Sequence, residues 1–252
     1  MPAYHPVTFE RHGKKHLLPP LSWAFAAEHH LAPLFPAEFA AAARFYPIVF
    51  IRDQEKLGSF ALLGLRPGNN LMLDAHHRWA ANYIPAVYRR YPFQMAPIKE
   101  KNEQYALCID EASGRIADNG GTPLFDANGN RAGILENALK FATECLRHTQ
   151  AGEAFCSLLN GSELLGPLRI DLKEGEKTLR VEGLLCVDDK KFGALPDADF
   201  LGLRKAGALP LIYAHLFSLA NLRVLADRHK NLRKQAAAPA APAAILPDSF
   251  NF

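Results

Sequence analysis

The chain has 252 residues, 49% of them hydrophobic, so it is long enough and apolar enough to bury the core of a globular protein. Its 29 lysines and arginines against 26 aspartates and glutamates leave a formal net charge of only +3, which is too small to predict nucleic-acid binding. The four cysteines are too widely spaced for a zinc ribbon, and we expect free, buried thiols.

The N-terminal segment predicts a wrapping region with two short helices, near Leu21–His30 and Pro36–Arg44. Its first residues, MPAYHPVTFERHGKKHLLPP, lack the apolar run of a secretory signal, so we expect a cytoplasmic protein. Two later windows, Leu31–Ile51 and Ala208–Ala226, are apolar but interrupted by proline or polar residues. We expect neither to span a membrane, so the chain is not predicted to be an integral membrane protein.

The middle of the chain predicts strands. A strand is expected over Tyr46–Ile51, and GSFALLGLRPGNNLML predicts two more, separated by a turn at Arg66–Asn70. Another short apolar run covers Gln104–Asp110, and a long connection rich in glycine and asparagine follows from Ser113 to Gly133.

The second half mixes helices with one hairpin. Apolar residues recur at helical spacing over Ile134–Leu159, with Gly152 as a candidate break. The alternating pattern of Leu168–Val181 predicts a hairpin, and helices are expected over Asp197–Lys205 and Leu209–Gln235.

These elements predict an α+β fold, in which a mostly antiparallel sheet is covered by the C-terminal helices. We expect a single domain over residues 1–236. The alanine- and proline-rich tail, residues 237–252, is predicted to be disordered and dispensable for stability.

The segment WAANYIPAVYRRYPF, Trp79–Phe93, combines aromatic rings with two adjacent arginines. Pro85 obstructs a continuous helix, so we expect a break after Ile84 and a fresh turn around Tyr88. In one interpretation the rings anchor the segment, while Arg89 and Arg90 stack on rings or pair with carboxylates such as Asp110 or Glu111. In the other, arginine and tyrosine line a pocket for an anion or a peptide.

Three blocks of the sequence carry a resemblance to a known family. They are GLRPGNNLMLDAHHRWAANYIPAVYRRYPF, LCIDEAS and LRKAGALPLIYAHLFSLANLRVL, and they lie within Phe35–Leu225. The blocks resemble SapC-type bacterial proteins, whose pattern has Asn-Leu-Phe followed by Asp-x-x-Gly-x-Trp. This chain has Met72 in place of the phenylalanine and His77 in place of the glycine, and the missing glycine predicts a less tight turn.

The resemblance implies a protein linked to surface-layer biogenesis or protein secretion, with no cofactor. We therefore expect a non-catalytic accessory or binding protein with a protein or peptide partner. The alternative is a cytoplasmic enzyme that acts on a small anionic or peptide substrate at Trp79–Phe93.

Other candidate sites have ordinary structural interpretations. Asp74, His76 and His77 carry metal-ligand chemistry, but their order differs from the usual iron site, so we expect a polar turn, no metal and no effect of chelators on stability. Ser218 lies three residues after His215 on a predicted helix, where a buried polar pair is expected rather than a catalytic one.

The predicted binding residues are therefore Trp79, Tyr83, Arg89, Arg90 and Tyr91, and no catalytic residue is predicted. Of the two arginines, we expect Arg90 to act as the structural clamp and Arg89 to face a ligand or partner.

Overall fold

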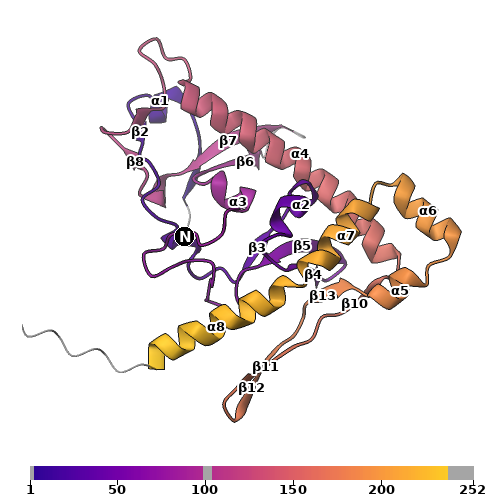
Figure 1. Cartoon of the computed structure of the whole chain (residues 1–252). Coiled ribbons are helices and arrows are strands. Elements are labelled where there is room, and N and C mark those ends of the chain that lie inside the picture. The colour runs from indigo at the N-terminus through magenta and orange to yellow at the C-terminus, as the bar shows by residue number, and fades with distance from the viewer. Residues whose placement is uncertain (1–2, 99–103, 238–252) are drawn as a thin grey trace, which may run out of the picture.

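The computed structural model describes residues 3–98 and 104–237, so the predicted tail beyond Ala237 lies outside the described residues. These residues form an α+β fold of antiparallel strands and covering helices, as predicted (Figure 1). The elements up to residue 98 are, in chain order, β1 (Tyr4–Pro6), α1 (Phe9–His12), β2 (His16–Leu17), η1 (Ala24–Ala26), β3 (Leu31–Pro33), η2 (Pro36–Glu38), α2 (Phe39–Ala42), β4 (Ile48–Asp53), β5 (Lys56–Leu62), α3 (Ala86–Arg89) and β6 (Phe93–Pro97). Those from residue 104 onward are β7 (Tyr105–Asp110), η3 (Glu111–Ser113), β8 (Ile116–Ala117), β9 (Thr122–Pro123), α4 (Gly133–Gly161), β10 (Leu165–Pro167), β11 (Ile170–Glu174), β12 (Lys177–Val181), β13 (Leu185–Val187), α5 (Asp189–Gly193), α6 (Asp197–Lys205), α7 (Leu209–Ser218) and α8 (Asn221–Ala237).

The largest sheet has five strands in the order β10-β13-β4-β5-β3, and each pairing in it is antiparallel. Strand β4 lies at its centre, and the side chains of Ile48, Val49 and Phe50 are completely buried. Consecutive buried side chains point to opposite faces of a strand, so this sheet must be covered on both sides.

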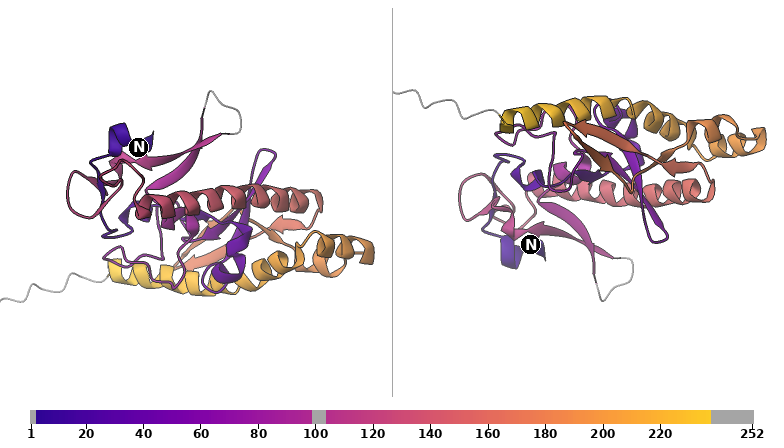
Figure 2. Two further views of the ribbon diagram at one scale, coloured as in Figure 1. Left: turned by 90° about the horizontal axis from the view of Figure 1, so that it is seen from above. Right: turned by 90° about the horizontal axis from the view of Figure 1, so that it is seen from below.

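Helices supply that cover. Helix α4 packs against β5, while α7 packs against β4 and β13. Figure 2 shows α4 and the α7–α8 pair on opposite sides of the sheet. The main hydrophobic core lies between these layers and includes Phe50, Phe155, Leu159, Ile212 and Leu225.

A second, smaller core lies under two three-stranded sheets, β1-β7-β6 and β8-β2-β9. The same helix α4 serves both cores, because its first half buries Leu135 and Ala142 in the smaller core while its second half buries Phe155 and Leu159 in the larger one. The predicted break at Gly152 does not occur, and α4 runs unbroken over 29 residues.

The predicted C-terminal helix, Leu209–Gln235, is instead two helices, α7 and α8. Ser218 ends α7: its hydroxyl donates to the carbonyl of His215 at 2.5 Å and accepts from the backbone N–H of Ile48 at 2.8 Å. A serine that bonds back to its own helix competes with the helical ladder, which accounts for the interruption before Asn221.

Two other local predictions are wrong. The helix expected over Leu21–His30 is only the short turn η1, followed directly by β3. The second strand expected in GSFALLGLRPGNNLML is absent among the described elements; its end contributes one isolated bridge, between Leu73 and Trp79. The hairpin is confirmed as β11–β12, with Ile170 opposite Val181.

Candidate functional site

The Trp79–Phe93 segment holds only one short helix, α3, so most of its shape depends on side chains from elsewhere in the chain. The break expected after Ile84 is present, since Pro85 is the N-terminal cap of α3. The peptide bond between Tyr91 and Pro92 is cis, and β6 begins at Phe93.

Glu38 fastens the first half of this segment. Only 6% of Glu38 is exposed, and one carboxylate oxygen accepts from the hydroxyl of Tyr83 and from the backbone N–H of Ala86, both at 2.7 Å. The other oxygen accepts from the N–H of Phe35 at 3.0 Å. A buried carboxylate is tolerated only when its lone pairs are used, so these donors make Glu38 a polar clamp.

Tyr46 is a second anchor for the same stretch. Its hydroxyl donates to the carbonyl of Tyr83 and accepts from the indole Nε1 of Trp79 at 2.7 Å. Burial raises the pKa of the Tyr46 hydroxyl far above its ordinary value, so this group is neutral. The polar side-chain atoms of Trp79 and Tyr83, two of the predicted binding residues, are therefore hydrogen-bonded within the protein.

The two arginines differ, since Arg89 is exposed and Arg90 is half-buried. Arg89 donates from Nε to the carbonyl of Ile84 at 2.9 Å, and its guanidinium carbon lies 5.0 Å from the ring centre of Phe141 and 5.6 Å from that of Tyr83. Among the described residues, Arg90 makes no hydrogen bond or ion pair through its side chain. The observed clamp contacts thus belong to Arg89 and not to Arg90, while a ligand-facing role of Arg89 stays a prediction; the predicted pairing with Asp110 or Glu111 occurs for neither arginine.

The carboxylates Asp110 and Glu111 have other partners. Asp110, which is buried, accepts from the hydroxyl of Tyr91 at 3.0 Å. Glu111 pairs with Arg11 and with His12 at the N-terminal end of the chain. The hydrogen bond from Arg11 is the main reason that the pKa of Glu111 is lowered to about 2.

Tyr91 is held at both ends and still reaches solvent. Its hydroxyl donates to Asp110, its carbonyl accepts from Arg115 Nη1 at 2.7 Å, and its ring stacks on Phe25 with centroids 4.2 Å apart. The side chain remains half-buried, so a rigidly positioned ring faces the surface. Rigid aromatic rings are common anchors in binding sites because they bury much area at little entropic cost.

Two cavities meet at this Tyr91–Phe25 pair. The first, of about 300 Å³, is lined by Arg89 and Arg115 together with the loop Leu18–Phe25. The second, of about 780 Å³, has the opposite charge character, since it is lined by Glu28 and Asp110. Other aromatic residues of this second cavity are Tyr4, His29 and Tyr88. We call these the basic cavity and the acidic cavity.

The structure therefore brings together only part of the predicted set. Arg89 and Tyr91 line the basic cavity, whereas Trp79, Tyr83 and Arg90 line neither of the two. That the set binds a ligand stays a prediction. Sequence reasoning missed Phe25, Arg115 and Glu38, and only Glu38 gave a signal, as a lone acid in the apolar stretch LFPAEFAAA.

The Asp74 region forms a polar turn, as expected. One oxygen of Asp74 accepts from the backbone N–H groups of His76 and Arg78, and the other pairs with Arg78 Nε at 2.7 Å. These bonds, first among them the one from the Arg78 backbone, lower the pKa of Asp74 to about 2. Within residues 3–98 and 104–237, no three histidine, cysteine, aspartate or glutamate side chains are grouped to hold a metal.

The backbone conformation at His77 explains why the family pattern has glycine at this position. Its φ is 55°, in the left-handed region that glycine enters without strain. The turn still closes, because the His77 N–H donates to the carbonyl of Asp74 at 2.9 Å. The looser turn expected from the missing glycine is therefore not observed.

His215 and Ser218 form the buried polar pair that was expected. His215 Nδ1 donates to the carbonyl of Ile48 at 2.9 Å, and Nε2 accepts from the N–H of Val187 at 2.9 Å. Burial lowers the pKa of His215 to about 4, so the ring is neutral. Both ring nitrogens are occupied by the backbone of β4 and β13, and the pair attaches α7 to the sheet.

The C-terminal helices α7 and α8 are apolar enough to be compared with a membrane span. Within the described residues, the stretch Leu209–Lys234 is long and apolar enough to cross a membrane by length and composition. Such a stretch is weak evidence of a membrane span, since core helices have the same properties.

Comparison with protein families yields one match, to the family described as SapC, over residues 7–225. No curated protein and no solved structure matches the chain. The family match covers both cores, the basic cavity, the acidic cavity except Tyr4, helix α7 and the start of α8.

Proposed function

The chain belongs to the SapC family, and we propose that it is a non-catalytic accessory or binding protein that acts in surface-layer or protein-secretion processes. We further propose that it binds a peptide segment of a protein partner at the Tyr91–Phe25 pair. The enzyme that acts on a small anionic or peptide substrate stays an alternative hypothesis.

The observation that carries this proposal is the opposite charge of the two cavities on either side of one aromatic pair. Arg89 and Arg115 suit a carboxylate or a backbone carbonyl, while Glu28 suits an amine or a basic side chain. A peptide carries both acceptors and donors along its backbone, so it can contact both cavities. Tyr91 and Phe25 offer it an apolar surface between them.

A peptide-display experiment tests the binding step. The purified protein selects peptides from a random displayed library, and their binding is then measured to the variants Tyr91→Ala and Phe25→Ala. We expect selected peptides to lose at least tenfold in affinity for both variants. The matched control is Leu158→Ala, a change of an exposed apolar residue on α4 outside both cavities, which should bind like the original protein.

The proposed role in surface-layer or protein-secretion processes is tested in the source organism. Deleting the gene should reduce the amount of a surface-layer or secreted protein outside the cell, and the Leu158→Ala gene should restore it while the Tyr91→Ala gene should not. An unchanged set of external proteins would contradict the proposed process. Selected peptides that bind Tyr91→Ala and the original protein equally would contradict the proposed site.

A further inference from the structure

Helices α7 and α8 carry an apolar strip that the protein core does not cover. Tyr213, Phe217 and Val224 are 41%, 75% and 48% exposed; the rings of Tyr213 and Phe217, one turn apart on α7, stack with centroids 6.4 Å apart, and Val224 follows on α8. We call these three residues the α7–α8 strip. In the apolar window of Leu209–Lys234 only 22% is buried, whereas a core helix of similar composition is mostly buried.

The opposite side of the same helices is firmly attached to the protein. His215 and Ser218 are completely buried and bond to the backbone of β4, and Leu225 lies in the main core. Crossing a bilayer would break these bonds and expose the sheet. The pair is therefore placed to lie along a surface, not to insert through one.

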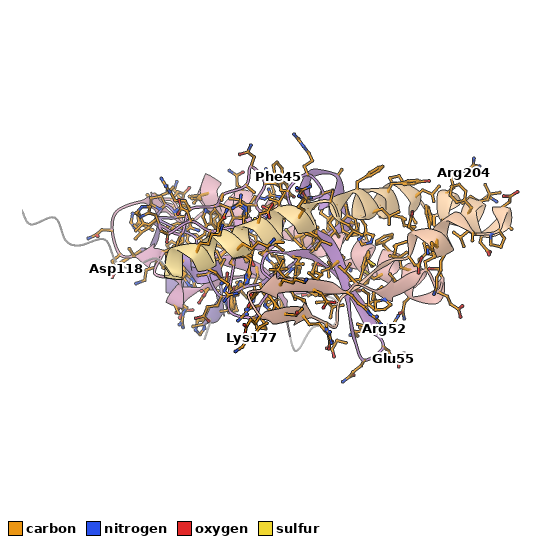
Figure 3. The ribbon with its side chains drawn as sticks, turned by 60° about the horizontal axis from the view of Figure 1, so that its bottom comes forward. Phe45, Arg52, Glu55, Asp118, Lys177 and Arg204 are labelled. Carbon is orange, nitrogen blue, oxygen red and sulfur yellow. The ribbon has the colours of Figure 1, made fainter. Side chains whose placement is uncertain are left out.

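Positively charged residues lie on the helices and the loop that flank the strip, and Lys230 and Lys234 lie further along α8, beside Glu174 of the hairpin. Exposed arginines and lysines, none of which forms an ion pair within the described residues, lie on α8, on the last turn of α6 and on the loop after α2: Arg44, Arg204, Arg223, Lys230 and Lys234. The guanidinium of Arg44 lies over the ring of Phe45, at 5.6 Å from its centroid. Figure 3 shows Phe45 and Arg204 along the same edge of the molecule. On α7 and α8, Asp227 is the one acidic residue, and α6 has Asp197 and Asp199 in its first turn.

We propose that the α7–α8 strip docks on the surface of an anionic lipid bilayer. Phe217 and Tyr213 enter the boundary between headgroups and acyl chains, and the surrounding cations contact lipid phosphates. This combination of exposed aromatic residues with unpaired cations is the signature of an interfacial helix. It goes beyond the binding of a peptide at Tyr91, which lies in a different part of the molecule.

A second copy of the chain fits this surface less well. In a symmetric dimer each copy presents the same patch, so the cations of both copies would face one another across the apolar contact. On these two helices Asp227 would compensate few of them. The charge pattern therefore favours lipid phosphates over self-association.

The test is sedimentation of the full chain with vesicles. We expect binding to vesicles of phosphatidylglycerol and phosphatidylethanolamine, weak binding to phosphatidylcholine, and a decrease of binding as salt increases. Phe217→Ser should reduce binding to the anionic vesicles about tenfold, as should the pair Arg223→Glu and Lys230→Glu. All three residues are exposed, so these variants should fold, which circular dichroism verifies.

The matched controls change similar residues elsewhere. Leu158→Ser removes an exposed apolar side chain from α4, and Lys140→Glu reverses an exposed charge on the same helix; both should bind vesicles like the original protein. Equal binding to neutral vesicles, absence of vesicle binding, or equal losses in the controls would overturn the proposal. So would a concentration-dependent dimer that Phe217→Ser dissociates in the absence of vesicle binding.

Discussion

The Trp79–Phe93 segment and strand β4 both depend on buried polar side chains, but they depend on them differently. Strand β4 pairs with β5 along its length and with β13 at Phe50, while the carbonyl and N–H of Ile48 bond to His215 and Ser218. The segment has few backbone partners, and Glu38 and Tyr46 supply its main long-range contacts. Removing one polar anchor of the segment should therefore lower the free energy of unfolding more than removing one polar anchor of the strand.

The largest effect is expected for Glu38→Ala. This change leaves the Ala86 and Phe35 N–H groups and the Tyr83 hydroxyl without their acceptor, and the free energy of unfolding should fall by about 3–5 kcal/mol. Urea unfolding measures it. Glu55→Ala is the control, because Glu55 is exposed in the turn between β4 and β5 (Figure 3), and a change within about 0.5 kcal/mol is expected there.

The second effect concerns strand β4, and it is a dependence of the free energy of unfolding on pH that arises from His215. His215 is neutral in the folded protein with a pKa near 4, while the unfolded chain has the ordinary value of 6.5. Between these values the unfolded state binds more protons, so stability is complete above pH 6.5 and decreases as the pH falls towards 4, by at most roughly 3 kcal/mol. Unfolding the original protein and His215→Gln across this range should show a weaker pH dependence in the variant. Equal dependence of stability on pH in the two proteins would contradict the lowered pKa of His215.

Tyr46→Phe should have an intermediate effect. It removes one hydroxyl and leaves the Trp79 indole N–H and the Tyr83 carbonyl without that partner, at a cost of about 1–3 kcal/mol. Tyr213→Phe removes the hydroxyl of an exposed tyrosine and should cost almost nothing. If both variants unfold at the same urea concentration, Tyr46 does not anchor the segment.

The two arginines sharpen the comparison within the segment. Arg89→Ala loses the bond to Ile84 and the packing on Phe141 and should destabilise by about 1–2 kcal/mol. Arg90→Ala should cost less, about 0.5–1 kcal/mol, because Arg90 is half-buried but its side chain makes no hydrogen bond to a described residue. Thermal unfolding of both variants measures the difference, and a larger loss for Arg90 would restore the original expectation.

The smallest effect concerns the turn that precedes the segment. His77 has a φ of 55°, so His77→Gly should relieve backbone strain and stabilise the protein by about 0.5–1 kcal/mol. His76→Gly, next to it but without a positive φ, should destabilise slightly because glycine adds freedom to the unfolded chain. Calorimetry of the two variants distinguishes these opposite signs.

The sequence by itself determined the regular elements. Helical spacing predicted α4, and alternation predicted the β11–β12 hairpin, because periodic patterns reflect a local geometry that repeats. The break before Pro85 and the family membership also followed from local motifs.

Only the tertiary structure decided where irregular backbone finds its partners. Glu38 contacts a segment more than forty residues away, and Ser218 receives a bond from Ile48 across most of the chain. Nothing in the sequence near Arg89 and Arg90 distinguished the two, because their difference arises from Phe141, a residue of a distant helix. Buried polar groups must be paired wherever the fold places them, and that placement is a property of the whole chain.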